Sequence, residues 1–429
     1  MPVQPVKPNK KMEENIMKKL LAFLLVAVLA VAAFGCAAPA ASEPAAEPSG
    51  TAAEPAAPAE PAAGGDKVIK IGVFEPFTGE NGGGGYQEVL AIRYANQVKS
   101  TVNIGGEEYK IELVEADNKS DKTEAVTAAQ SLMSAGVSVV LGSYGSGVSI
   151  AAGEIFAENK VPAIGCSCTN PQVTLGNDYY FRVCFIDPFQ GTVMANYALQ
   201  EGAKKAAVIT QLGDDYSSGL GSYFVKAFTA KGGEVVEQQF QTNQTDFKAI
   251  LTEIKAANPD IIFAPSSIAT APLLIKQARE LGITCPITAG DTWQNQTIAD
   301  NAGADAEGVV VSTFFDEADT SNAAATEFIK GFKEYLKANP ADLEKNGGEG
   351  VAAVSALGYD SYMVAVAAIE AAGSTEGAAI RDSLPSVQID GVTGAIAFDE
   401  NGDAEKDMAY LNVIKDGKFT FLKTVALGE

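Results

Sequence analysis

From residue 66 onward, short apolar runs alternate with longer helix-like stretches, and this alternation constrains the fold more than any other feature. Runs with the length of buried strands lie at 68–73, 111–116, 137–141, 163–164, 206–210, 235–240, 261–264, 287–289 and 309–312. Stretches typical of helices lie at 123–135, 149–158, 218–231, 247–256, 271–281, 323–337 and 351–372. The repeated order of strand, helix and strand predicts an α/β fold with parallel sheets and helices on both faces.

The length of this region predicts two lobes. Residues 66–429 number 364, which exceeds what one hydrophobic core usually organises. The end of the chain differs, because strand-like runs follow one another without an intervening helix and predict an antiparallel addition; they lie at 395–398, 409–415 and 418–424. Asp187 followed by Pro188 predicts the start of a helix, with the Asp187 side chain as its cap.

The first 36 residues have the pattern of an export signal. Two lysines precede an apolar run of 15 residues at 20–34, which is shorter than the roughly 17–25 residues of a membrane-spanning helix. Small residues before Cys36 resemble a bacterial lipobox, so we expect this cysteine to be lipidated. A plain cleaved signal and a retained anchor are the alternatives. Met1, Met12 and Met17 are all possible start sites.

Residues 37–65 have the composition of a disordered tether. They contain 13 alanines and 6 prolines, and no side chain large enough to pack a core. A tether after a lipidated cysteine places a globular protein near a membrane without embedding it. The sequence therefore predicts an extracytoplasmic protein that is lipid-anchored to the bacterial cell membrane.

Composition excludes several classes of function. The chain contains no histidine, which rules out Ser-His-Asp and Cys-His catalysis and zinc sites with imidazole ligands. The formal net charge is −23, so the basic footprint of a nucleic-acid-binding protein is missing. No spacing of residues supports Ser-Lys or paired-carboxylate chemistry, and we therefore do not expect an enzyme.

Two loops that follow strand-like runs and precede helices suggest a cleft between the lobes. The first, at 142–147, contains Ser146 between two glycines, and the second lies at 265–267. Ligands of open α/β sheets bind at the carboxyl ends of strands, where helix N-termini favour an anion. Ser146 is therefore a candidate for binding a carboxylate. A glycine-rich connection with an N-cap serine is the alternative.

Two further loops carry candidate binding residues. Thr169 follows the run at 163–164 and offers both a hydroxyl and a backbone N–H group. Asp291 follows the run at 287–289 and stands near Trp293, the only tryptophan. This aspartate is suited to pairing an ammonium group, and the indole to packing an apolar side chain. An N-cap aspartate beside a surface tryptophan is the alternative.

Three other motifs do not predict a cofactor or metal site. The four glycines at 82–85 lack the ending of a phosphate-binding loop and favour a flexible loop at the rim of the cleft. Residues 399–403 favour a β-turn, because Ala404 stands where a calcium loop needs glycine. The pair Cys166 and Cys168 makes a poor metal site without histidine or a second pair.

The pairing of the cysteines stays open at this point. In an exported protein, disulfides are possible, and buried free thiols are the alternative. The four cysteines concerned are Cys166, Cys168, Cys184 and Cys285.

Several segments, taken in order, resemble the leucine/isoleucine/valine-type substrate-binding proteins of branched-chain amino acid ABC transporters. The matching segments are IGVFEPFTG at 71–79, EADN at 115–118, VPAI at 161–164, TNP at 169–171, FRVCF at 181–185, DYSSGL at 215–220, QARELG at 277–282, GD at 290–291 and AEGV at 306–309. The resemblance covers about 66–429.

This resemblance implies the type I periplasmic binding protein fold, in which two Rossmann-like α/β lobes joined by three crossovers close on a ligand. Lobe 1 would comprise 66–186 plus 313–395, and lobe 2 would comprise 187–312 plus 396–429. It further implies a monomer that captures an amino acid, branched-chain or otherwise apolar, and delivers it to the permease subunits of an ABC importer. A ligand sensor that signals to a partner other than a transporter is the alternative.

The resemblance also implies how the polar ends of the ligand are bound. The α-carboxylate would meet the Ser146 hydroxyl and the hydroxyl and N–H group of Thr169. The backbone of Ser167 and Cys168 would line the same wall. The ammonium group would meet Asp291.

Aromatic side chains complete the implied site. Tyr216 would cover the ligand, and Tyr144 and Phe77 would contact its side chain. Many family members carry a further tyrosine where this sequence has Ser266 and Ser267. Without that ring the pocket is expected to be roomier or more polar, which puts a strict preference for leucine, isoleucine and valine in doubt.

Overall fold

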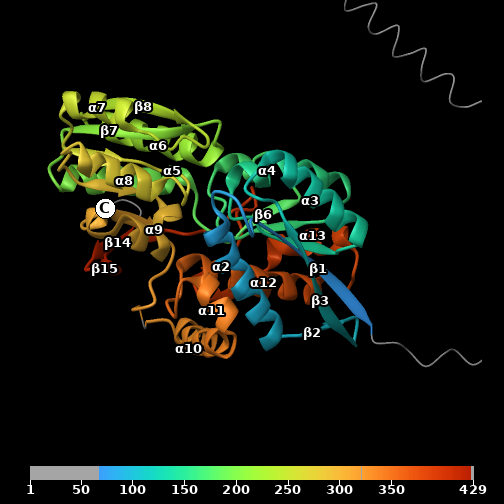
Figure 1. Ribbon diagram of the computed structural model, residues 1–429. Helices are drawn as coiled ribbons and strands as arrows, with labels where there is room; N and C mark the ends of the chain where they lie inside the picture. The colour runs from blue at the N-terminus through green and yellow to red at the C-terminus, as the bar shows by residue number, and fades with distance from the viewer. Residues whose placement is uncertain (1–66, 320, 427–429) are drawn as a thin grey trace, which may run out of the picture. The chain divides into compact units, whose positions relative to one another are not determined.

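The computed structural model describes residues 67–319 and 321–426 (Figure 1). The predicted export signal at 1–36, which includes the lipidation residue Cys36, and the tether at 37–65 lie outside the described residues.

The first sheet has six strands in the order β2-β3-β1-β4-β5-β6, and five of them are parallel. Its strands are β1 (Val68–Glu75), β2 (Thr101–Ile104), β3 (Glu107–Asp117), β4 (Val139–Leu141), β5 (Ala163–Gly165) and β6 (Tyr180–Arg182). The antiparallel member is the edge strand β2, which pairs with β3. The helices between these strands are α2 (Gly82–Val98), α3 (Lys122–Ala135) and α4 (Ser146–Glu158).

The second sheet has seven strands in the order β15-β14-β11-β10-β9-β7-β8. Its strands are β7 (Lys205–Leu212), β8 (Glu234–Gln241), β9 (Ile261–Phe263), β10 (Ile287–Ala289), β11 (Val310–Thr313), β14 (Met408–Lys415) and β15 (Lys418–Ala426). Strands β7 to β11 are parallel, and β14 and β15 form the predicted antiparallel addition. The helices are α5 (Asp187–Gln200), α6 (Asp215–Ala230), α7 (Lys248–Ala257), α8 (Ala271–Glu280) and α9 (Gln296–Ala302).

Helices later in the chain return to the first sheet. They are α10 (Ala323–Ala338), α11 (Pro340–Asn346), α12 (Ala353–Ala372) and α13 (Gly377–Ser383). Helix α12 packs along α2, where Ser355 Oγ donates to the Gln87 carbonyl and the Tyr362 hydroxyl donates to the Lys99 carbonyl. Figure 1 shows α10, α11 and α12 beside α2 and the strands of the first sheet. A short hairpin of β12 (Ile389–Gly391) and β13 (Gly394–Ile396) follows.

The chain therefore passes between the two sheets three times: after β6, after β11 and after β13. Two sheets, each covered by helices and joined by three crossing segments, confirm the predicted fold class. The residue boundaries of the two lobes stay a prediction.

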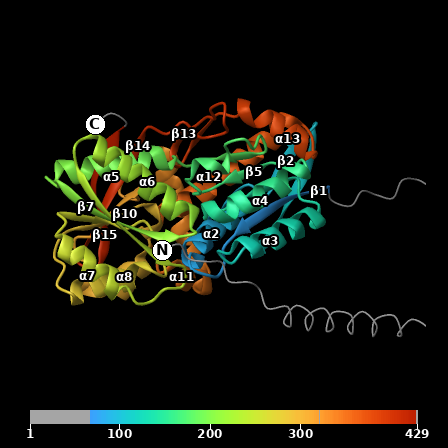
Figure 2. The same cartoon turned by 90° about the horizontal axis from the view of Figure 1, so that it is seen from above.

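The central strands explain why the apolar runs of the sequence are continuous. All residues of β4, β5, β9 and β10 are buried. Figure 2 shows α5 and α6 on one side of the second sheet and α7 and α8 on the other. With helices on both faces, a parallel strand has no side exposed to water and carries apolar residues at every position.

Three local predictions are wrong. The glycines at 82–85 are not a flexible loop, because they form the first turn of α2. Asp187 does not cap α5; it is the first helical residue, after the cap position Ile186, and its side chain makes no cap hydrogen bond. The run at 395–398 does not join β14 and β15, because β13 pairs with β12 in a separate hairpin.

Other local predictions are decided by the structure. The turn at 399–403 is confirmed, since Asp399 Oδ1 accepts hydrogen bonds from the backbone N–H groups of Asn401 and Asp403. The four cysteines of the described region are free thiols, of which Cys285 is half-buried and the others are buried. Among described residues no single helix is long and apolar enough to cross a membrane; α12 and the segment 377–386 pass only jointly, with a bend of 103° between them.

Candidate ligand-binding site

A cavity of about 230 Å³ lies where loops of the two sheets meet. Loops at the carboxyl ends of β1 and β4 form one side, and the β7–α6 and β10 loops form the other. Side chains that line it include Glu80, Tyr144, Ser146, Gln211, Tyr216 and Thr292. Its volume is just below the roughly 300–1,000 Å³ of drug-sized ligand pockets, which favours a small ligand.

Hydrogen bonds and an ion pair join the two sides of this cavity. Lys122 Nζ lies 2.8 Å from Asp215 Oδ2, and Gln211 Nε2 donates to Glu80 Oε2 at 2.8 Å. Each pair takes one residue from the loops of the first sheet and one from the loops of the second. These contacts hold the carboxyl-end loops of the two sheets together around the cavity.

Ser146 stands at the start of α4, directly after the cap residue Gly145. Its hydroxyl accepts a hydrogen bond of 3.1 Å from the backbone N–H group of Asn170, so the β4 and β5 loops are joined at this point. Asn170 Nδ2 in turn donates to the Asp215 carbonyl of α6 at 2.7 Å. Ser146 therefore lies at a helix N-terminus, where partial positive charge favours an anion.

Asp291 follows β10 on the side of the second sheet; it does not line the cavity itself but is hydrogen-bonded to Tyr216, which does. Its Oδ1 atom accepts hydrogen bonds from Gln190 Nε2 at 2.7 Å and from the Tyr216 hydroxyl at 3.0 Å. Burial raises the pKa of Asp291 to about 6, so the carboxylate is mostly ionised at neutral pH. Burial also raises the pKa of Tyr216 well above its usual value, which keeps its hydroxyl protonated as a donor.

Unpaired polar atoms lie between these two sides. Thr169 Oγ1 and both carboxylate oxygens of Asp187 are buried, and apart from the contact between these two side chains they make no hydrogen bond to a described residue. The Asp187 N–H group donates to the Thr169 carbonyl at 3.0 Å, so the two residues are neighbours. Burial raises the pKa of Asp187 to about 8. Buried polar atoms without partners are costly, and a bound ligand with donors would satisfy them.

The remaining predicted residues occupy different places. Tyr144 lines the cavity, and its hydroxyl donates to the Thr292 carbonyl at 3.3 Å. Ser167 and Cys168 are buried behind the cavity, and the Cys168 carbonyl accepts from an Arg182 guanidinium N–H group. Phe77 is half-buried outside the cavity, where its ring packs edge-on against a tyrosine of α2.

Trp293 differs from both sequence interpretations. It is fully buried, so it is not a surface residue, and its Nε1 atom donates to the Ser266 carbonyl at 3.1 Å. The cavity is lined by its neighbour Thr292 instead. Sequence reasoning did not assign Gln190 or Asp187 to the site. Their only signal in the sequence was their place at the start of a helix, α5, that follows a crossover.

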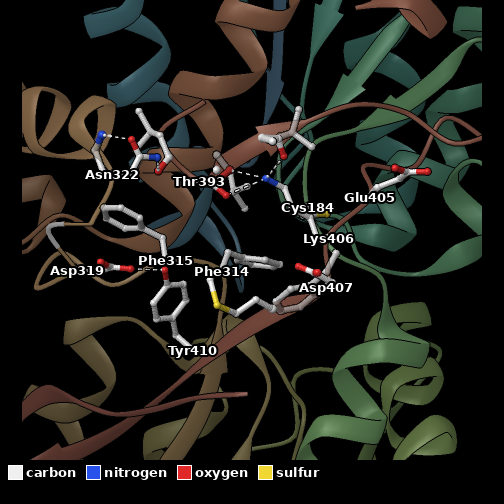
Figure 3. A pocket seen from close by; sticks show the side chains of 18 of the residues that line it. Cys184, Phe314, Phe315, Asp319, Asn322, Thr393, Glu405, Lys406, Asp407 and Tyr410 are labelled. Atoms are coloured by element: carbon white, nitrogen blue, oxygen red, sulfur yellow. Dashed lines mark hydrogen bonds between the residues drawn. The ribbon is translucent and has the colours of Figure 1, made fainter. Parts of the chain in front are cut away.

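A second cavity, of about 610 Å³, lies among the three crossing segments (Figure 3). Some polar groups on its wall already have protein partners. Lys406 Nζ donates to the Thr393 and Ala395 carbonyls, and the Tyr410 hydroxyl donates to Asp319 Oδ2 at 2.7 Å. None of the eight predicted contact residues lines it. The smaller cavity is lined by three of them, Tyr144, Ser146 and Tyr216, and is therefore the candidate ligand site.

The sequence model of a protein family described as periplasmic binding protein matches residues 68–418 of this chain. This range includes both sheets up to the first residue of β15 and all residues around the smaller cavity. The chain belongs to the periplasmic binding protein family.

Relatives of this periplasmic binding protein fall within the type that the sequence resemblance indicated. A Leu/Ile/Val-binding protein homolog 3 from Brucella melitensis is 30% identical over 365 residues, which cover 83% of this chain and 94% of the relative. An amino acid binding protein from Pseudomonas aeruginosa is 31% identical over 350 residues, covering 78% and 87% of the two chains.

Solved structures resemble this periplasmic binding protein over the same region. A leucine-binding protein from Thermotoga maritima has a TM-score of 0.77 and 36% identity, and the match covers 83% of this chain and 99% of that one. A branched-chain amino acid transporter substrate-binding protein from Streptococcus pneumoniae, solved in complex with isoleucine, has a TM-score of 0.75 and 30% identity; the match covers 84% and 100%.

Proposed function

We propose that this protein captures an amino acid, branched-chain or otherwise apolar, between its two lobes and delivers it to an ABC importer. The observation that carries the proposal is the division of charge around the small cavity, where Ser146 lines one side and Tyr216, which lines the other, is hydrogen-bonded to Asp291. A serine at a helix N-terminus lies on the side of the first sheet, and a buried carboxylate lies on the side of the second. This arrangement suits a ligand with an anionic and a cationic end.

The carboxylate end of the ligand would bind at the first sheet. Ser146 supplies a hydroxyl and the N-terminus of α4, and Thr169 supplies a buried hydroxyl without another partner. Ser167 and Cys168 support this wall from behind, because they belong to the same loop as Thr169.

The ammonium end would bind Asp291. The carboxyl group of Asp187, at the start of α5 after the first crossover, would lie near this end. Tyr216 donates to Asp291 and lines the cavity, so it both orients the carboxylate and covers the ligand. Because the lobes contribute opposite ends of the site, only a closed arrangement binds both ends, and the ligand shifts the equilibrium toward closure.

The side chain of the ligand would lie against Tyr144, whose ring is buried at the cavity. Phe77 is left out of this proposal because it does not line the cavity. Ser267 lines the cavity where many relatives carry a tyrosine, so polar atoms border the ligand there. The names of the relatives, which include leucine-binding and Leu/Ile/Val-binding proteins, support an apolar amino acid.

We further propose the location and organisation stated from the sequence. Residues 1–36 would form the lipoprotein signal region, in which cleavage before Cys36 leaves this cysteine as the N-terminus that carries the lipid anchor outside the cytoplasm. The lobes would comprise 66–186 plus 313–395 and 187–312 plus 396–429. Mass spectrometry of the membrane-extracted protein tests the first point, since an unmodified Cys36 would contradict it.

Calorimetric titration of the region 66–429 with a panel of amino acids tests the binding function. We expect one or a few apolar amino acids to bind, and no binding to any amino acid would overturn the proposal. Uptake of the bound amino acid by vesicles that contain the cognate permease tests delivery. Ligand binding without stimulated uptake would favour the sensor alternative.

A further inference from the structure

Two glutamates that the proposed site does not use lie directly behind its first-sheet wall. Glu75 is the last residue of β1, and Glu88 lies in the second turn of α2. Both side chains are fully buried. Carboxylates are rarely buried unless they are paired, so the contacts of this pair require an explanation.

Glu75 holds the loop that carries Ser146. Its Oε2 atom accepts a hydrogen bond of 2.7 Å from the backbone N–H group of Tyr144 and one of 3.4 Å from the Ser143 hydroxyl. Ser143 is fixed in turn by Asn118 Nδ2, which donates to its hydroxyl at 2.9 Å. Glu75 therefore positions the β4 loop directly before helix α4.

Glu88 holds the loop that carries Thr169. Its Oε1 atom accepts a hydrogen bond from the Ser167 hydroxyl. Each glutamate thus uses one carboxyl oxygen to fix one of the two loops that form the first-sheet wall of the site.

The second oxygen of each carboxyl group has no neighbour to pair with except the opposite carboxyl and the Cys166 thiol. Glu75 Oε1 and Glu88 Oε2 are buried and make no hydrogen bond to any other described residue. One oxygen from each carboxyl group lies with Cys166 Sγ inside a group spanning at most 4.8 Å, so the two carboxyl groups are close neighbours. Two ionised carboxylates at this distance would repel strongly, whereas a single proton between them makes a charge-assisted hydrogen bond.

No positively charged group among the described residues acts on the two glutamates. The titratable groups that act on them from neighbouring elements are Tyr144 and Tyr180, the thiols of Cys166 and Cys168, and Asp291 across the cavity. The nearby cation on β6, Arg182, is paired with Asp403 and with loop carbonyls.

We propose that Glu75 and Glu88 share a proton, and that this hydrogen bond clamps the two loops of the first-sheet wall into the geometry that binds the ligand. They are positioning residues, because neither lines the cavity. The expected effect of the clamp on ligand affinity rests on the proposed function. The shared proton itself can be tested without any ligand.

The clamp makes the ligand-free fold depend on pH. Burial raises the pKa of Glu75 from 4.5 to about 8, and burial beside Glu75 raises that of Glu88 well above its usual value. An acid with a raised pKa in the folded state contributes stability that is fully present below its unfolded pKa and is lost as the pH rises through its folded pKa. The contribution of Glu75 should therefore be lost as the pH rises from about 4.5 to about 8, and the contribution of Glu88 is also lost with rising pH.

Glutamine substitutions separate a shared proton from simple packing. In Glu88→Gln, the amide oxygen still accepts from Ser167, and the amide N–H group donates to an ionised Glu75. Glu75→Gln is the reciprocal case. In the double variant, both amides must turn their oxygens to the loops, so two N–H₂ groups face each other without an acceptor. A packing role predicts additive effects, whereas a shared proton predicts two mild single variants and a severe double variant.

Urea unfolding of the ligand-free protein from about pH 5 to about pH 9 is the first measurement. We expect each single variant to lose the part of the pH dependence that Glu75 and Glu88 contribute, and the double variant to unfold at lower urea at every pH. The exposed Glu112→Gln on β3 is the matched control and should follow the wild type. Additive effects, or single variants with the wild-type pH profile, would overturn the clamp.

Affinity for L-leucine as the probe is the second measurement. The single variants should bind within ~threefold of the wild type near neutral pH and keep their affinity at about pH 9, where the wild type weakens. The double variant should lose about tenfold or more. If no variant and no wild type binds leucine, the proposed function is in question, but the unfolding result still decides the clamp. Stoichiometric metal in the purified protein would overturn the shared proton and assign a cation to this place.

Discussion

Arg182 and Asp403 form a buried ion pair between the last strand of the first sheet and the third crossing segment. Arg182 Nε donates to Asp403 Oδ1 at 2.5 Å, and the arginine side chain is fully buried. Its Nη1 atom also donates to the carbonyls of Cys168 and Asn170, each at 2.7 Å. One guanidinium group therefore links a crossover to the loop proposed to bind the ligand carboxylate.

We predict that Asp403→Ala lowers the free energy of unfolding by about 3–5 kcal/mol, because it leaves the Arg182 charge buried without its partner. Urea denaturation measures this loss. The exposed ion pair of Lys248 and Glu280 is the control, and Lys248→Ala should change stability by less than about 1 kcal/mol. Equal effects of the two substitutions would show that burial does not govern the Arg182 pair.

The Asp291 carboxylate is the second test, and it concerns the ligand. We predict that Asp291→Ala weakens binding of the ligand found in the panel by about 3–5 kcal/mol, because the ammonium group is then buried without a counter-charge. Isothermal titration calorimetry measures the affinity. Asp300→Ala, at an exposed position of α9, should leave it unchanged. Wild-type affinity in Asp291→Ala would reject the proposed ammonium site.

The fold was predictable because strand and helix signals in this chain are carried by long, local patterns. The fully buried strands β9 and β10 appear in the sequence as apolar runs. Ser146 and Asp291 were predicted because each follows such a strand, whereas Tyr216 was predicted from the family resemblance. Strand β2 alternates between buried and exposed residues, and β6 contains Arg182, so neither has an unbroken apolar run in the sequence.

Tertiary contacts explain what sequence reasoning missed. The glycines at 82–85 suggest a loop because glycine is a poor helix former. They are required in α2 by close approach: a Cβ atom on Gly85 would lie 2.4 Å from the Pro76 carbonyl oxygen. The partnership of Glu75 and Glu88 was equally hidden, since one ends a strand and the other lies in this unrecognised helix. Neither contact has a local pattern.

Asp187 gives a prediction on pH. Burial raises its pKa from 3.8 to about 8, so the folded protein keeps this carboxyl group protonated at pH values where the unfolded chain ionises it. The protonated acid therefore favours folding most fully below about pH 4, and this contribution is lost as the pH rises toward 8. Asp187→Asn stays neutral in both states. We predict equal stability of the two proteins near pH 4 and a growing advantage of the variant up to about pH 8.

Urea unfolding midpoints of the ligand-free proteins across this range measure the difference. The variant Asp260→Asn provides a contrast, because backbone N–H groups lower the pKa of this exposed carboxylate. Its loss of stability should be present throughout this range and shrink only as the pH falls below about 4. A stability difference between Asp187→Asn and the wild type that does not change with pH would contradict the assignment of a raised pKa.

Gly84 and Tyr144 provide the last prediction, which tests the wall of the cavity. A Cβ atom on Gly84 would lie 2.4 Å from Tyr144 Cε2 and 2.8 Å from its hydroxyl oxygen, so Gly84→Ala must displace the ring. Gly83 stands in the same helical turn, but a Cβ atom there would lie 3.7 Å from the nearest atom, Asn295 Nδ2. Both substitutions gain similar helix propensity, and they differ in the clash.

We predict that Gly84→Ala costs about 1–3 kcal/mol of stability through overpacking, whereas Gly83→Ala is neutral or slightly stabilising. Ligand affinity should fall in Gly84→Ala because the displaced Tyr144 ring no longer fits the ligand side chain. Shortening the ring in a Gly84→Ala/Tyr144→Leu double variant should restore stability without restoring affinity, since it removes the clash and the aromatic wall together. Thermal unfolding and calorimetric titration separate the two effects, and unchanged affinity in both Gly84 variants would remove Tyr144 from the proposed site.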